Sequence, residues 1–155
     1  MAEQASFSPR KVTFLCIKHC LYEGWDLQAS LDKALLSKNL SFKDKSLATE
    51  MSYGYLRLKI RLDYILAKFL HSPGKLPRDM HIALGLAAYE LIFLDRVPCY
   101  ASVDYWVGHI KKEFPKLTKL ANAVLRKVAE NKPEFEKKDF YLPNSTSNIA
   151  FLSRY

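Results

Sequence analysis

Glycine is scarce in this sequence: five glycines occur among 155 residues, and none of them are clustered. A β-sandwich needs many more turn residues, and a loop that cradles phosphates needs closely spaced glycines. Long apolar runs are also absent, since no segment approaches the roughly 18 residues that a membrane-spanning helix requires. The sequence therefore argues against an all-β fold, a glycine-rich phosphate loop and a membrane-spanning helix.

Cysteine is also rare, with an odd total of three, and the N-terminus lacks the basic and apolar regions of a signal peptide. We therefore expect a cytoplasmic protein with reduced thiols. Cys16, His19 and Cys20 lie within one helical turn, but one turn supplies only part of a tetrahedral metal site, and no second pair completes it. Because cysteine is often a buried residue, a structural role is the better interpretation, and we expect neither a metal nor a cofactor in this chain.

Evidence for a catalytic site is equally thin. Cys99 follows Pro98, and such a pair marks the nucleophile of some RNA methyltransferases. A nucleophile of that kind needs a cofactor pocket and neighbouring acid or base groups, which the sequence does not offer. The interpretation of Cys99 as a helix-start residue is therefore preferred, and we expect no catalytic residue.

Positive charge is abundant and uneven, with a formal net charge of +8. Residues 41–75 carry seven basic and three acidic residues, and residues 116–155 carry eight and four. Residues 76–115, between them, carry four basic and five acidic residues. Basic segments around a near-neutral centre indicate a surface that attracts polyanions, and nucleic acid is the first candidate.

Apolar residues recur at helical spacing in six segments, and no convincing strand pattern is present. The first helix should begin at Ser8-Pro9, where serine caps and proline suits the first turn. The third is the longest and should run from near Ser41 to the breaker Ser72-Pro73-Gly74. The others are expected from about Leu27 to Leu35, Pro77 to Leu94, Val103 to Phe114 and Leu117 to Val128. Six helices with short connections predict an all-α bundle.

Two expectations concern the end of this bundle. In the fifth helix, Val103, Val107, Ile110 and Phe114 should face inward, with Lys111 and Lys112 outward. Beyond Asn131 the apolar pattern fades. We therefore expect one domain over residues 1–135, followed by a polar linker or tail over residues 136–155.

One face of the third helix alternates aromatic and basic residues at spacings of four, four, three and four: Tyr53, Arg57, Arg61, Tyr64 and Lys68. Cations neutralise phosphates and aromatic rings stack on unpaired bases, so this pattern suits single-stranded or looped RNA. A solvated helix face with half-buried tyrosines explains the same pattern equally well. Arg126 and Lys127 on the last helix are, by themselves, typical surface charges.

Four motifs occur in order along the chain: Met51-Ser-Tyr-Gly-Tyr-Leu-Arg57, Leu86-Ala-Ala-Tyr-Glu-Leu91, Leu94-Asp-Arg-Val-Pro-Cys-Tyr-Ala-Ser-Val103 and Asn122-Ala-Val-Leu-Arg126. Together they resemble the NusB-type RNA-binding domain over about residues 9–130. The resemblance implies an all-α fold of six to seven helices in two three-helix subdomains, with RNA as the partner.

Two branches of that superfamily are candidates. Tyr-Gly-Tyr-Leu-Arg and Asn-Ala-Val-Leu-Arg are closer to the N-terminal domain of the Sun/RsmB rRNA cytosine-5 methyltransferases, and residues 150–155 are similar to the linker that precedes their catalytic domain. The resemblance thus implies an rRNA-recognition domain, not an enzyme by itself, whose S-adenosylmethionine-dependent chemistry would reside in a following domain. The alternative is a free transcription antitermination factor that binds boxA-like RNA together with NusE, a ribosomal protein.

Three sets of cations are candidate RNA contacts. Free NusB proteins carry a dense arginine cluster on the first helix, whereas only three cations stand in that region here, which weakens the antitermination alternative. The candidate sets are Arg10, Lys11 and Lys18, which the resemblance favours; Arg57, Arg61 and Lys68, which composition favours; and Arg126 with Lys127. A different alternative is a protein-interaction module without RNA affinity, anchored by Tyr100, Tyr105 and Trp106 as exposed aromatic residues.

Overall fold

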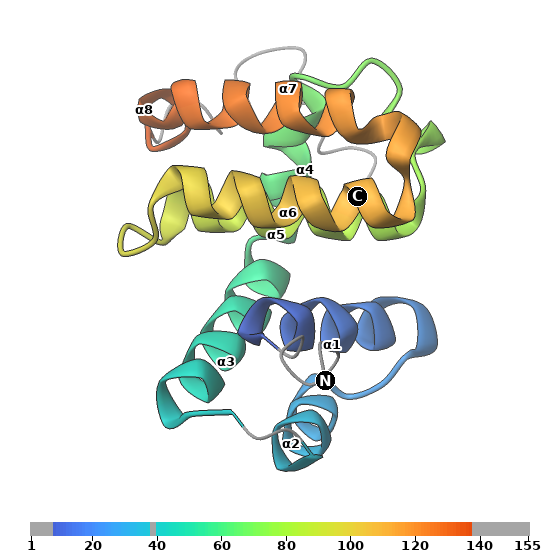
Figure 1. Ribbon diagram of the computed structural model, residues 1–155, viewed down its shortest axis with the longest axis vertical. Helices are drawn as coiled ribbons and strands as arrows, with labels where there is room; N and C mark the ends of the chain where they lie inside the picture. Colours follow the sequence, from blue (N-terminus) through green and yellow to red (C-terminus); the bar gives the residue numbers. More distant parts are fainter. Residues whose placement is uncertain (1–7, 38–39, 138–155) are drawn as a thin grey trace. The chain divides into compact units, whose positions relative to one another are not determined.

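The computed structural model describes residues 8–37 and 40–137, which form helices and no strand (Figure 1). The all-α prediction is confirmed. The helices are α1 (Pro9–Glu23), α2 (Leu27–Ser37), α3 (Phe42–Arg57), α4 (Lys59–Ala67), α5 (Arg78–Phe93), α6 (Cys99–Glu113), α7 (Thr118–Glu130) and α8 (Lys132–Phe135), with short 3-10 helices η2 (Pro73–Lys75) and η3 (Pro115–Leu117). The chain divides into two compact units, Met1–Arg57 and Leu58–Tyr155.

The first unit contains three helices, and α1 packs against both α2 and α3 (Figure 1). Ser8 caps α1 as expected, because its Oγ accepts a hydrogen bond from the backbone N–H of Lys11 at 3.2 Å, and Pro9 occupies the first turn. Gly24 ends the helix with φ of +72°, a left-handed conformation that favours glycine. Local sequence therefore sets both ends of α1.

The prediction of one long third helix is wrong, because the chain forms two helices there, α3 and α4, separated at Leu58. No proline or glycine marks the break, and the residues around it are good helix formers. The cause is tertiary: Met51 and Tyr55 are buried in the first unit, whereas Leu62 and Ile65 are buried in the second. The chain changes core at Leu58, and the helix is interrupted there.

The second unit is built around α5, which packs against α4, α6, α7 and α8. Every residue from Ile82 to Ile92 is buried, as the apolar sequence on all sides of this helix predicts. None of the described helices is long and apolar enough to cross a membrane. The helix serves instead as the central element of this unit.

A buried carboxyl group joins α5 to α6. Glu90 is 1% exposed and accepts hydrogen bonds from Ser102 Oγ at 3.0 Å and from Trp106 Nε1. The buried face of α6 is therefore Ser102, Trp106 and Ile110, at intervals of four residues. The prediction was right for Ile110 but wrong for Val103, Val107 and Phe114, which are only half-buried, because the two donors must face Glu90.

The end of the second unit extends the expected pattern by one short helix. Phe135 in α8 is buried, and its ring meets that of Phe69 edge to face at 6.0 Å. The predicted polar tail over residues 136–155 lies outside the described residues from position 138 onward. Apolar packing therefore reaches Phe135, the predicted end of the domain.

Replacing Glu90 with alanine tests the buried hydrogen bonds from Ser102 and Trp106 to its carboxyl group. The substitution leaves two buried donors without an acceptor, so we expect the free energy of unfolding to fall by about 3 kcal/mol. Ser102→Ala removes one donor and leaves the acceptor bonded to Trp106, and should cost about 1 kcal/mol. Urea denaturation followed by circular dichroism measures both; equal effects would show that the carboxyl group is not the shared centre.

Candidate nucleic-acid interface

The three cations of the first candidate set lie on α1 and are half-buried. Lys11 and Lys18 are two turns apart on the same side of the helix, away from the buried Cys16. Arg10, Lys11 and Lys18 each already take part in an interaction within the protein. Lys11 and Lys18 thus share one side of α1, Arg10 lies about a quarter-turn away, and the contact of these cations with RNA remains a prediction.

The second candidate set does not form one continuous helix face, because the break at Leu58 divides it. Arg57 is exposed in the last turn of α3, in the first unit, whereas Arg61 and Lys68 belong to the second unit. The guanidinium of Arg61 lies over the ring of Phe93 at 5.4 Å, and Lys68 Nζ lies over the ring of Tyr64 at 4.8 Å. These three cations stay RNA-contact predictions.

The two tyrosines of that set do not form the base-stacking surface that the sequence pattern suggested. Tyr64 is buried, so its ring has no face open to a base. Tyr53 is exposed, and its hydroxyl group hydrogen-bonds the side chain of Gln28. The alternation of tyrosines and cations therefore reflects burial of Tyr64 and leaves only Tyr53 on the surface.

The third candidate set is the most openly presented. Arg126 and Lys127 are exposed on α7, whose opposite face is buried through Ala121, Val124, Leu125 and Val128. Neither cation has a carboxylate partner within the described part of the chain. Both charges are available to a polyanion in solution.

Lys132 shows the opposite arrangement. Its Nζ donates to Asp95 Oδ1 at 2.9 Å, and this hydrogen bond raises the pKa of Lys132, although partial burial acts in the other direction. A second carboxylate, that of Glu136, lies 4.0 Å away. Lys132 therefore serves to hold α8 to the connection between α5 and α6, and it is a poor candidate for an RNA contact.

An aromatic cluster that the sequence reasoning missed lies at the end of α1. The His19 ring stacks on the Trp25 ring with centroids 4.5 Å apart, and His19 Nδ1 hydrogen-bonds Glu23 Oε2 at 2.8 Å. Lys33 Nζ lies 5.3 Å from the centre of the Trp25 ring, which is partly exposed. The sequence signal for this cluster was the glycine at position 24, directly before Trp25. Its left-handed conformation ends α1 and turns the chain back toward that helix.

Cys16 is buried, and its burial raises the pKa of the thiol, while a hydrogen bond with Ser30 lowers it. With His19 engaged by Trp25 and Glu23, the group around Cys16 and Cys20 is structural packing. Among residues 8–37 and 40–137, no cluster of three metal-binding side chains occurs.

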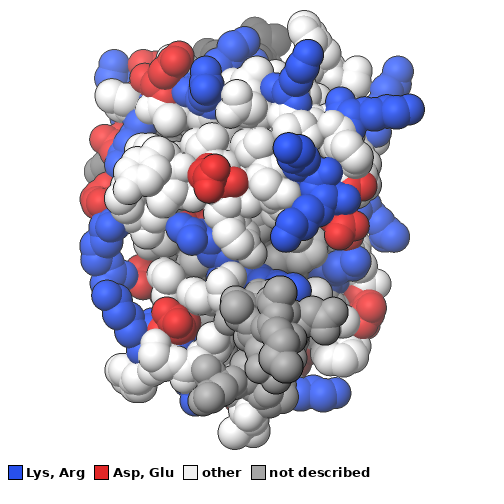
Figure 2. All heavy atoms as spheres, viewed as in Figure 1, with Lys and Arg blue, Asp and Glu red and all other residues white. Residues whose placement is uncertain are grey.

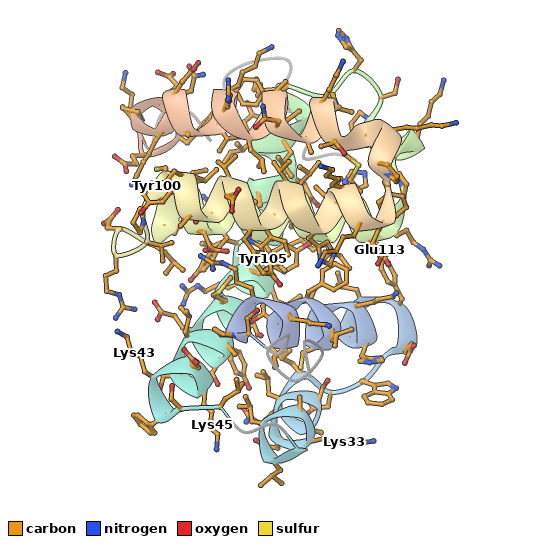
Figure 3. All side chains as sticks on the ribbon, viewed as in Figure 1. Lys33, Lys43, Lys45, Tyr100, Tyr105 and Glu113 are labelled. Carbon is orange, nitrogen blue, oxygen red and sulfur yellow. The ribbon has the colours of Figure 1, made fainter. Side chains whose placement is uncertain are left out.

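The aromatic residues of the protein-interaction alternative separate into three environments. Tyr100 is 78% exposed at the start of α6, and Tyr105 is half-buried on the same helix (Figure 3). Trp106 is completely buried, and its indole N–H donates to Glu90. The expectation that Trp106 is exposed is therefore wrong, because its indole N–H has a buried acceptor. Of the three, only Tyr100 is a prominent surface anchor.

The chain is thus an all-α protein of two helical units, with exposed cations in both. The chain belongs to the NusB family, whose model matches residues 8–130. The predicted resemblance is thereby confirmed.

The relatives carry one recurring name. The chain is 39% identical over 106 residues to the ribosomal RNA small subunit methyltransferase B of Thermus thermophilus, covering 68% of this chain and 26% of that protein. It is 30% identical over 146 residues to the protein of the same name from Photorhabdus laumondii, covering 92% and 32%. A probable methyltransferase B of Bacillus subtilis is 32% identical over 108 residues, covering 68% and 24%. The chain thus spans between about a quarter and a third of these relatives.

Gly24→Ala tests how the Trp25 cluster is held. Because alanine is strained at φ of +72°, we expect the free energy of unfolding to fall by about 1 kcal/mol, although no atom would meet the new Cβ within 4 Å. Gly108→Ala is the matched control: it also meets nothing within 4 Å, but it lies within α6 and should stabilise by roughly 0.5–1 kcal/mol. Thermal denaturation of both variants checks the signs; stabilisation by both would contradict the backbone argument.

Proposed function

We propose that this chain is an RNA-binding domain that recognises rRNA for a small-subunit rRNA methyltransferase. The observation that carries the proposal is the match to the relatives named methyltransferase B, over 68% and 92% of this chain in two of them. They are three to four times longer than the matched segment, so the methyl transfer itself is assigned to a further domain. In this proposal the present chain supplies binding and S-adenosylmethionine binds elsewhere.

Surface charge supports RNA as the partner. The described part of the second unit holds 14 lysines and arginines against nine acidic residues, one of which is the buried Glu90. Exposed cations release counterions from a phosphate backbone when they bind it, so they supply affinity without reading base sequence. A domain of this kind would hold and orient the RNA while another domain performs the chemistry.

The other two functions have less support. The relatives reported above are methyltransferases, which favours that branch over the free antitermination factor with NusE. The protein-interaction alternative loses Trp106 as an anchor and keeps Tyr100. Tyr100 is compatible with a contact to a neighbouring catalytic domain, which would accompany RNA binding rather than replace it.

A salt titration tests the proposed function directly. Binding of a single-stranded rRNA fragment, followed by fluorescence anisotropy, should weaken with salt by a logarithmic slope of about 0.7 for each phosphate contact. Contact with three or more cations therefore predicts a slope of about 2 or steeper. Absence of RNA binding even at low salt would contradict the proposal and favour a protein-interaction module.

The role of α1 is tested by Arg10→Ala combined with Lys11→Ala. If both side chains contact phosphates, the double variant should bind RNA more weakly and its salt slope should fall by about 1.4, without loss of the fold. Lys43→Ala with Lys45→Ala removes the same charge from the same unit and serves as control. An unchanged slope in the α1 variant would exclude Arg10 and Lys11 from the RNA contact.

A further inference from the structure

Four lysines gather where α6 leads into α7. Lys111 and Lys112 lie in the last turn of α6, Lys116 lies in η3, and Lys119 lies in the first turn of α7. All four are exposed, and α6, η3 and α7 pack against one another, so one end of the second unit carries all of them. We call these four residues the lysine turn.

The lysine turn is not neutralised. Between residues 105 and 127, Glu113 is the only acidic residue, at the end of α6 (Figure 3). None of the four lysines forms an ion pair with it or with any other carboxylate in the described ranges. Figure 2 shows lysine and arginine side chains projecting from this end of the second unit.

Helix stability does not account for the whole cluster. Lys111 and Lys112 suit the negative end of the α6 dipole, but Lys116 and Lys119 lie at the positive end of α7, where cations are unfavourable. The first turn of α7 contains no acidic residue to compensate. Lys116 and Lys119 are thus electrostatically unfavourable for α7 itself, which indicates that they bind an external anion.

The backbone beneath the lysine turn is fixed by short-range hydrogen bonds. Thr118 Oγ1 donates to the carbonyl oxygen of Pro115 at 2.8 Å, and the N–H of Leu117 donates to that of Phe114 at 2.9 Å. The ring of Pro115 restricts the backbone angle φ at the start of η3. The lysine side chains are flexible, but their points of attachment are preorganised, which lowers the entropic cost of binding.

We propose that the lysine turn is a phosphate-binding surface for the RNA backbone, and that its contact continues along α7 to Arg126. Lys119 and Arg126 are seven residues apart on the same exposed face, a rise of about 10 Å along the helix. The ligand is the phosphodiester chain and not a particular base, because no exposed aromatic ring lies among these residues. This inference rests on the proposed RNA-binding function and assigns a part of the surface to it.

The test compares two quadruple variants of equal charge. Lys111, Lys112, Lys116 and Lys119 are replaced with alanine in one, and Lys33, Lys43, Lys45 and Lys137, none of which lies in α6, η3 or α7, in the other. If the lysine turn supplies four contacts, its variant should lose up to about 3 from the salt slope for single-stranded RNA, at 0.7 per contact. The control variant should change the slope by less than about 0.7.

The outcomes separate this inference from the proposed function. If the wild-type chain binds RNA and both variants lose the same slope, or neither loses any, the lysine turn is not the site and RNA binding stands. If the wild-type chain binds no RNA, the proposed function fails. Substituting the four lysines with arginine controls for folding: this variant keeps the charges and should retain the wild-type slope, and its loss of binding would also overturn the inference.

Discussion

The second unit depends on the carboxyl group of Glu90. A buried carboxyl group without partners would be strongly destabilising, and here Ser102 and Trp106 provide the donors. Both donors lie on α6, so satisfying Glu90 fixes the rotation of α6 about its own axis. The orientation of Lys111 and Lys112, one and two residues after the buried Ile110, follows from that rotation.

The consequence extends from α6 to the next helix. Because only four residues, three of them in η3, connect α6 to α7, α7 has little freedom to place its buried face anywhere but against α5 and α6. Its cations are then directed outward by default, opposite Val124 and Val128. A polar contact in the core therefore determines where charges appear on the surface, without any direct contact between the two.

Most of the fold could be predicted because helical periodicity, caps and breakers are local properties of the sequence. Ser8-Pro9 and the apolar α5 are the clearest cases. The break at Leu58 could not be found this way, because the sequence there is strongly helical and only the existence of two separate cores requires the chain to turn. The inward face of α6 was misjudged for a related reason: Val103 and Val107 are more apolar than Ser102, but the acceptor that selects Ser102 lies twelve residues away in sequence.

The candidate site was less predictable, because a binding surface combines residues from several elements. Cations on a single helix, such as Arg126 with Lys127, could be found in the sequence. The sequence also predicted that Lys111 and Lys112 point outward. Lys116 and Lys119 follow that last pair within nine residues of sequence, but the tight connection through η3, which keeps all four at one end of the second unit, was not predicted. Conversely, Arg57 and Arg61 looked like neighbours on one face and belong to different units.

Exposed cations and exposed aromatic side chains offer different chemistry to an RNA strand. Lysine and arginine bind phosphates, which every RNA sequence carries, so these side chains can contribute affinity and orientation but no base selectivity. Exposed aromatic side chains in the first unit, Trp25 and Tyr53, are of the kind that stacks on unpaired bases. Stacking also tolerates all four bases. If the chain recognises one rRNA site, as proposed, that selection requires RNA shape, or contacts from another domain, in addition to the surfaces described here.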